Sequence, residues 1–271
     1  LGMDPADFSI LYQDTEAAPF DAGSSGSQTT MNNGRAVVAA AGEVRDMLLD
    51  MAAKRLEVAR EDLELADGHV RVVGAPDRAF EFSALAGSGE RLIGKGSGRP
   101  PKNPPCHAEG CLGRLGMESF LEPQVFTHAA RVKVDRETGV VRVLHVAAAH
   151  DSGTILNRIG ASGQVYGGVV MGIGQALLEV SQLDADGRQR NPPPLDYKPV
   201  TASAAPRIDV AWLETPAENG GPLGTKGVGE PPTVPTPGAI ANAIAQVVGS
   251  RIRELPMTPE RVWAAASGQA E

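Results

Sequence analysis

The chain has 271 residues, of which 42% are hydrophobic and 21% are charged, and its formal net charge is −8. These proportions are ordinary for a globular protein with a buried core, and the acidic balance gives no basic footprint for nucleic acid or an anionic membrane. No apolar stretch approaches the roughly 18 residues of a membrane span, and no basic segment precedes an apolar one as in a signal peptide. We therefore expect a cytoplasmic protein.

Glycine and proline are abundant, at 32 and 21 residues, whereas aromatic residues make up only 4%. Such a composition predicts many loops and close approaches between backbone segments, which favours a cofactor cradle over an aromatic-lined pocket. The two cysteines lie in CHAEGC, residues 106–111, which is neither a CxxC pair nor a four-ligand metal pattern. We expect them to be reduced thiols in a loop.

The first hundred residues predict a lobe that mixes helices and strands. In chain order the predicted elements are a strand around Phe8 to Tyr12, a helix over 34–56, a hairpin over 58–74 and a short helix within 80–88. The stretch GKGSGRPPKNPP, residues 94–105, predicts an exposed connection between two lobes. Lobe one then covers about 1–105 and lobe two about 106–271.

The remaining residues predict a second lobe built around another hairpin. Two alternating segments flank RETG within residues 124–151 and predict that hairpin. The elements predicted after it are a glycine-rich helix over 163–180, a strand over 207–214, a helix over 239–249, a short strand over 251–257 and a helix capped by Thr258. The sequence contains no repeat and no parallel βαβαβ series, so the predicted class is α+β.

The loop SSGSQTTMNNG, residues 24–34, places hydroxyls and backbone N–H groups ahead of a helix. Amide dipoles and a helix N-terminus favour negative charge, so a phosphate could bind there. The loop lacks the GK[ST] of a P-loop and the G-x-G-x-x-G of a dinucleotide fold. Taken alone, it is better explained as a polar helix-capping loop.

The segment GASGQVYGGVVMGIG, residues 160–174, has glycines where a helix prefers alanine, each costing up to about 1 kcal/mol. Close approach of another backbone or of a rigid ligand would compensate for that cost, and Gln164 can donate and accept hydrogen bonds at the start of the helix. On these residues alone, tight packing between helices is the favoured explanation.

Two histidines and two aspartates are weaker candidates for a site. His145 and His150 should point to opposite faces of one strand or splay apart, and the sequence places no third ligand near them, so no histidine metal site is predicted. Asp14 and Asp151 follow predicted strands, where turns and caps use Asp routinely. We expect structural roles for both aspartates.

Glu230 lies between a run of glycines and a run of prolines in GTKGVGEPPTVPTPG, residues 224–238. The glycines permit positive φ and close approach of the backbone, and Pro231 should push Glu230 out of the helical region. A carboxylate held in such a turn and partly withdrawn from water can act as a general base, although the nearby Lys226 would oppose that role. The residues alone support a catalytic base and a surface carboxylate equally.

Four motif-bearing segments follow one another along nearly the whole chain: DAGSSGSQTTMNNGRAVVAAA, VAAAHDSGTILNRIGASGQVYGGVVMGIGQALLE, NPPPLDYKPVTAS and GTKGVGEPPTVPTPGAIANAIA. Together, in this order, they resemble the molybdenum-cofactor-binding subunit of the molybdenum hydroxylases, the xanthine dehydrogenase and aldehyde oxidase group. The resemblance implies that group's second molybdenum-cofactor-binding domain, an α+β fold with two lobes.

The resemblance also implies roles for individual residues. Glu230, in G-x-G-E-P-P, would be the catalytic base that takes the proton from a molybdenum-bound hydroxyl. The residues implied in cofactor binding are Gly26, Ser27, Gln28 and Thr29 at the pterin phosphate or its nucleotide extension, Gln164 at the pterin, and Val228 and Gly229 beside the metal. No metal ligand is implied. A large rigid pterin would explain both the Ser-rich loop and the Gly-rich helix, which reverses the explanations favoured above.

The implied reaction inserts a water-derived oxygen at an electron-poor C–H of a heterocycle or aldehyde. The cofactor would be molybdenum-molybdopterin, expected in its cytosine dinucleotide form, with iron–sulfur clusters and FAD on partner subunits or domains. The family's amino-terminal half has no counterpart in this sequence. We therefore expect Leu1 to begin within a domain, in a fragment or in a subunit split over two chains, and the chain alone to be inactive.

Two other interpretations remain open. The chain could be a non-catalytic module that binds pterin or phosphate for storage, insertion or assembly, in which case Glu230 would not be needed for turnover. It could instead be a simple phosphate-binding domain built on the SSGS loop, which would bind nucleotide without molybdenum.

Overall fold

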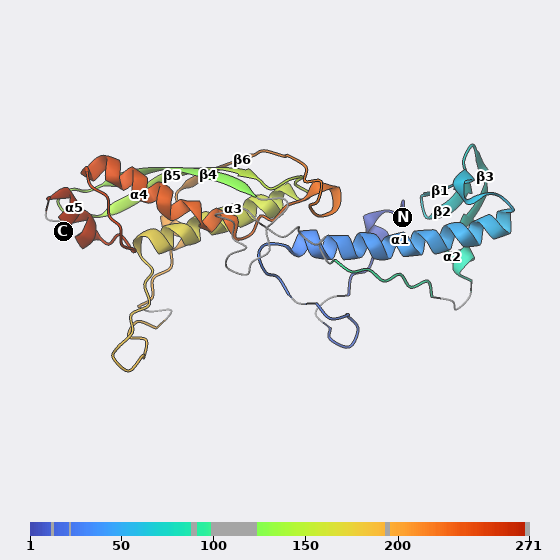
Figure 1. The fold of residues 1–271 in the computed structure, drawn as a ribbon, viewed down its shortest axis with the longest axis horizontal. Helices are drawn as coiled ribbons and strands as arrows, with labels where there is room; N and C mark the ends of the chain where they lie inside the picture. The colour runs from blue at the N-terminus through green and yellow to red at the C-terminus, as the bar shows by residue number, and fades with distance from the viewer. Residues whose placement is uncertain (12–13, 22, 88–90, 99–123, 193–195, 269–271) are drawn as a thin grey trace, which may run out of the picture. The chain divides into compact units, whose positions relative to one another are not determined.

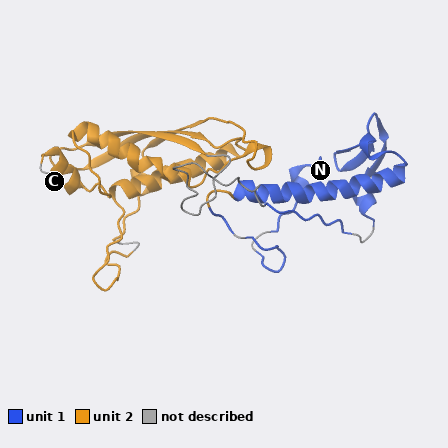
Figure 2. Cartoon of the chain, viewed as in Figure 1, with its two compact units in different colours: residues 1–25, 29–102 blue, residues 26–28, 103–271 orange. Residues whose placement is uncertain are grey.

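The computed structural model describes residues 1–11, 14–21, 23–87, 91–98, 124–192 and 196–268. The chain divides into two compact units, drawn in different colours in Figure 2: unit 1 comprises residues 1–25 and 29–102, and unit 2 comprises residues 26–28 and 103–271. The boundary predicted near residue 105 and the two cysteines lie outside the described residues.

Unit 1 packs one long helix against a small antiparallel sheet (Figure 1). Its elements are α1 (Thr29–Leu56), β1 (Leu63–Ala66), β2 (His69–Val72), β3 (Ala75–Glu81) and α2 (Phe82–Ala86). Leu48 and Ala52, one turn apart on α1, pack with Val70 in the buried cluster of this unit. Asp67 and Gly68 both have positive φ, as a two-residue hairpin turn requires, so the predicted hairpin is confirmed.

Unit 2 is a three-stranded sheet with helices on one face (Figure 1). β4 (Val125–Val134) and β5 (Val141–Asp151) form the predicted antiparallel hairpin, and β6 (Arg207–Trp212) pairs with β5 in parallel. The helices are α3 (Arg158–Leu177), which connects β5 to β6, α4 (Pro235–Val248) and α5 (Pro259–Ala266). The predicted α+β class is confirmed, with one parallel crossover that the sequence did not predict. In the described part of the chain, no helix combines the length and apolar character of a membrane span.

The core of unit 2 lies between the inner face of the sheet and α3, α4 and α5. Its buried members are Val146, Ala148, Val165, Val169, Ile173, Ala176, Ile240, Ile244, Val248, Met257, Val262 and Ala265. Those on α3 and α4 recur every three or four residues, so each helix presents one apolar face to the sheet. Burying a Val or Ile side chain of this kind contributes about 1.5–3 kcal/mol.

Two predicted strands do not form. Phe8 to Leu11 form no strand in the described part of the chain, and Ile10 and Leu11 remain 78% and 79% exposed. Residues 251–257 are irregular: Met257 N–H donates to the Ala176 carbonyl at 2.7 Å, and Pro256 has no N–H to donate. Alternating apolar residues make a strand only where a neighbour can pair its backbone groups.

The glycines of α3 fall into two groups. A Cβ at Gly168 would lie 2.6 Å from Pro232 Cβ, and one at Gly172 would lie 2.5 Å from Thr236 Cβ, so both glycines allow the segment before and within α4 to pack on the backbone of α3. At Gly163 and Gly167, a Cβ would meet no described atom within 4 Å. Tight helix packing therefore explains Gly168 and Gly172 and leaves Gly163 and Gly167 unexplained.

Gly172→Ala should destabilise the chain by about 1–3 kcal/mol, because the added methyl group overlaps Thr236. Gly167→Ala is the matched control on the exposed face of the same helix, and it should stabilise the chain by up to about 1 kcal/mol. Urea unfolding of the two variants measures both effects, and equal changes would contradict the division of the glycines.

Candidate functional site

Glu230 immediately precedes a short 3-10 helix, η6 (Pro231–Thr233), that leads into α4. Its φ of −81° and ψ of −36° are helical, so the prediction that Pro231 would keep it out of this region was wrong. The Glu230 carbonyl accepts the Thr233 N–H at 3.1 Å, and Pro232 is buried against α3. These tertiary contacts outweigh the local preference of a residue before proline.

Ser27 contacts Glu230 although 203 residues separate them in sequence. The Ser27 hydroxyl accepts the Glu230 N–H at 2.7 Å and donates to Glu230 Oε2 at 3.2 Å. Gly26 and Ser27 both have a φ of 60°, so two successive left-handed residues form the turn that presents this hydroxyl. The predicted base and the predicted cofactor loop are thereby brought together.

Two of the glycines before Glu230 make room for side chains from elsewhere. A Cβ at Gly227 would lie 2.7 Å from the Ser27 carbonyl oxygen, so only glycine allows the loop to come this close. A Cβ at Gly229 would lie 3.2 Å from Gln164 Oε1 and 3.5 Å from Ser27 Oγ. The Gln164 amide therefore lies beside Ser27 and the Glu230 turn.

The other predicted cofactor residues belong to both units. Gln28 lies in unit 2 with Gly26, and Val228 is half-buried against the core of that unit. Thr29 begins α1 in unit 1, where its hydroxyl donates to Ser24 Oγ at 2.7 Å. The residues that the structure brings together are Ser27, Gln164, Gly229 and Glu230.

Lys226 forms an ion pair with Asp151. Its Nζ lies 3.1 Å from Asp151 Oδ2, and the two side chains are only 7% and 16% exposed. Burial raises the pKa of Asp151, but hydrogen bonds from the Gly153 N–H and from Lys226, with the charge of Lys226, hold that pKa below its usual value. Lys226 therefore neutralises Asp151. Its ammonium group is engaged there, whereas the sequence analysis expected it to act on Glu230.

The histidines of β5 lie on opposite faces of the sheet, as predicted. His145 Nε2 lies 2.7 Å from Asp209 Oδ2 on the exposed face, whereas His150 is only 1% exposed. His150 Nε2 lies 2.8 Å from Nε2 of His128, a pair that the sequence analysis missed. The register of the hairpin could have revealed this pair. His128 lies opposite Ala148, so His150, two residues further along β5, is the diagonal neighbour of His128 on the same face.

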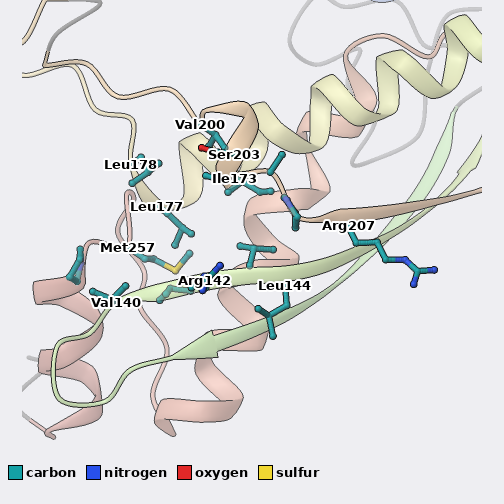
Figure 3. Close-up of a pocket in the computed structure, with 16 residues that line it drawn as sticks. Val140, Arg142, Leu144, Ile173, Leu177, Leu178, Val200, Ser203, Arg207 and Met257 are labelled. Carbon is teal, nitrogen blue, oxygen red and sulfur yellow. The ribbon is translucent and has the colours of Figure 1, made fainter.

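A cavity of about 590 Å³ lies elsewhere in unit 2 (Figure 3). Its apolar lining includes Val140 and Leu144 at the start of β5, and Leu177 at the end of α3. Gln164 lies near the start of α3, and Lys226 binds the end of β5. The Glu230 site is thus at the opposite ends of these elements, on an exposed part of the unit, and the cavity does not belong to it.

A family model described as "Molybdopterin cofactor-binding domain" matches residues 1–206. The chain belongs to this molybdopterin cofactor-binding domain family. In the described residues, no group of three or more His, Cys, Asp or Glu side chains is placed to hold a metal ion.

Relatives within the family are several times longer than this chain. It is 34% identical to the putative xanthine dehydrogenase molybdenum-binding subunit of Escherichia coli strain K12, over 97% of its own length and 34% of that protein. It is 30% identical to the nicotine 6-hydroxylase large subunit of Paenarthrobacter nicotinovorans, over 99% of its own length and 32% of that protein. The crystal structure of a Cu,Mo-CO dehydrogenase matches with a TM-score of 0.77 at 25% identity, over 94% of this chain and 31% of that one. The chain spans about a third of these relatives, and the predicted resemblance is confirmed.

The site's residues fit the family's cofactor. Because Gly229 has no Cβ, the Gln164 amide and the Ser27 hydroxyl both border the space that a side chain at position 229 would fill. Gly163 and Gly167 leave the α3 backbone bare on either side of Gln164. Hydroxyl, amide and exposed backbone groups are suitable partners for the heteroatoms of a pterin and for a phosphate.

Lowering the pH from about 7 to about 4.5 should destabilise unit 2 through its histidine pair. Burial, and then the neighbouring His150, lower the pKa of His128 from 6.5 to about 4, and burial lowers that of His150. Between about pH 6.5 and 4 the unfolded chain binds more protons than the folded chain, so stability is full above this window and is lost as the pH falls through it.

The urea midpoint measured across this range checks the prediction. His128→Gln keeps a hydrogen-bonding side chain but cannot titrate, so this variant should show a weaker dependence on pH. A wild-type midpoint that stays constant from about pH 7 to 4.5 would contradict the assignment of a neutral buried pair.

Proposed function

We propose that the chain is part of a molybdenum hydroxylase in which Glu230 is the catalytic base. The proposed reaction inserts a water-derived oxygen at an electron-poor C–H of a heterocycle or aldehyde. The observation that carries this proposal is the contact between Ser27 and Glu230, because it joins the predicted base to the predicted cofactor loop. Relatives named as xanthine dehydrogenase and nicotine 6-hydroxylase support a heterocyclic substrate.

The environment of Glu230 suits proton transfer. Its side chain is exposed, and its Oε2 accepts a hydrogen bond from the neutral Ser27 hydroxyl. The nearest basic residue in sequence, Lys226, is paired with Asp151. A carboxylate held in place by the Ser27 contact would be positioned to act as a general base towards a bound substrate or cofactor.

The residues around Glu230 would bind and orient the cofactor. Gly26, Ser27, Gln28 and Thr29 would hold the pterin phosphate or its nucleotide, Gln164 would hydrogen-bond the pterin, and Val228 and Gly229 would lie beside the metal. The molybdenum cofactor supplies the oxidation–reduction chemistry when bound. The chain's own part is to orient the cofactor and to hold a proton at the Glu230 carboxylate.

We further propose the cytosine dinucleotide form of the cofactor and a cytoplasmic, multi-subunit complex. The chain spans about a third of its relatives' length, so the complementary molybdenum-binding portion would come from another segment or another chain. Iron–sulfur and flavin subunits would carry away the electrons that the oxidation releases.

In the assembled enzyme, Glu230→Gln should lower kcat by about 10²–10⁴-fold, because glutamine keeps the size of the side chain but cannot take up the proton. Molybdenum and pterin content should stay near wild type. Glu137→Gln, at the exposed turn between β4 and β5, is the matched control and should leave turnover unchanged. Wild-type turnover in Glu230→Gln would instead favour a non-catalytic pterin-binding or assembly module.

The purified 271-residue chain should show negligible hydroxylase activity by itself, because the proposed function requires the complementary portion and electron carriers. Steady-state assays with and without the other components of the native complex measure this dependence. Substantial turnover by the chain alone would contradict the proposal. Nucleotide bound in a native complex that lacks molybdenum would favour the simple phosphate-binding domain.

A further inference from the structure

We propose that Lys226 and Thr236 are positioning residues that hold the Glu230 turn from its two sides. Each is connected to β5 through buried or half-buried polar side chains, Lys226 to Asp151, and Thr236 through His128 to the preceding residue, His150. The inference rests on the proposed role of Glu230 as a base, since it assigns what keeps that carboxylate in place.

The first tie lies before Glu230. The ion pair between Lys226 and Asp151 is almost fully buried, and the Lys226 N–H donates to the Ser152 carbonyl at 2.9 Å. The Thr154 N–H donates to the Gly224 carbonyl at 3.1 Å, so the segment entering the turn follows the end of β5 as a short ladder. The side-chain pair anchors a segment whose backbone is already aligned with the strand.

The second tie lies after Glu230 and runs through three side chains. The fully buried Thr236 hydroxyl donates to the Pro232 carbonyl at 2.9 Å. Since its one proton is used there, Thr236 can only accept from His128 Nδ1, which lies 2.9 Å away. The pattern assigns the Nδ1–H tautomer to His128.

The same tautomer determines how His128 meets β5. With its proton on Nδ1, His128 offers a bare Nε2, which must accept the Nε2–H of His150 at 2.8 Å. Every hydrogen bond in this series, which runs from His150 on β5 to the carbonyl of Pro232, thus has one donor and one acceptor. This series of hydrogen bonds reaches the Glu230 turn from the opposite side to Lys226.

The two ties end on a rigid support. His150 and Asp151 are consecutive, so their side chains leave β5 on opposite faces and reach the turn by separate routes. β5 is paired with β4 on one side and with β6 on the other. A catalytic group held on such a strand is placed more accurately than one held by a loop alone, and a misplacement of about 1 Å can cost about 100-fold in rate.

Matched substitutions in the holoenzyme separate positioning from simple stabilisation. Thr236→Val keeps the shape of the side chain without the hydroxyl, and Thr236→Ser keeps the hydroxyl. Thr236→Val should lower kcat per bound molybdenum by about 10–100-fold with little change in KM, whereas Thr236→Ser should retain most of it. Lys226→Met removes the charge of the other tie at similar length and should lower kcat in the same way.

Hydrogen–deuterium exchange provides a readout that does not depend on turnover. Peptides that cover residues 224–236 should exchange faster in Thr236→Val and Lys226→Met than in the wild type or Thr236→Ser, while peptides from β4 should not change. Wild-type exchange together with wild-type kcat per molybdenum in Thr236→Val would overturn the proposal. A lower melting temperature with unchanged kcat per molybdenum would also overturn it, because the ties would then serve the fold alone.

Two further variants keep the test decisive. If Lys226→Met does not fold, Lys226→Met combined with Asp151→Leu replaces the buried pair by apolar side chains, which proteins often tolerate. Full kcat in that folded double variant would exclude the first tie. If Glu230→Gln retains turnover, the proposed base is wrong, and the exchange of Thr236→Val against Thr236→Ser still decides whether the turn is held as inferred.

Discussion

The packing of residues 231–236 on the backbone of α3 is the contact on which the rest of unit 2 depends. It is possible only because Gly168 and Gly172 have no side chain where Pro232 and Thr236 lie. The contact joins α3 to α4 and so closes the core over the sheet. The same contact gives Glu230 its helical backbone, against the local preference of a residue that precedes proline.

The charges near this contact are paired locally, with one exception. Asp151 forms an ion pair with Lys226, and the half-buried His128 shares a hydrogen bond with the buried His150, both in their neutral forms. Glu230 is an exposed carboxylate that accepts a hydrogen bond from the Ser27 hydroxyl. These neighbours of the turn are thus paired and at least half-buried, whereas the Glu230 side chain is exposed.

The apolar cavity of unit 2 and the polar surface around Gln164 and Ser27 are different places. The apolar cavity lies at the start of β5 and the end of α3, where it offers volume but little that would recognise a pterin. The surface around Gln164 and Ser27 offers hydroxyl, amide and bare backbone beside a carboxylate. A polar cofactor needs such groups to fix its orientation, so the proposed cofactor site is the second place.

The sequence by itself determined the features that depend on near neighbours. These are the long helix of unit 1, the hairpin turning at Asp67, the cap at Thr258 and the motifs that identify the family. Only the tertiary structure decided the contact of Ser27 with Glu230, the pairing of His128 with His150 and the parallel alignment of β6, since each joins segments distant in sequence. The strand predicted at Phe8 does not form for the same reason, because a strand exists only where another strand pairs with it.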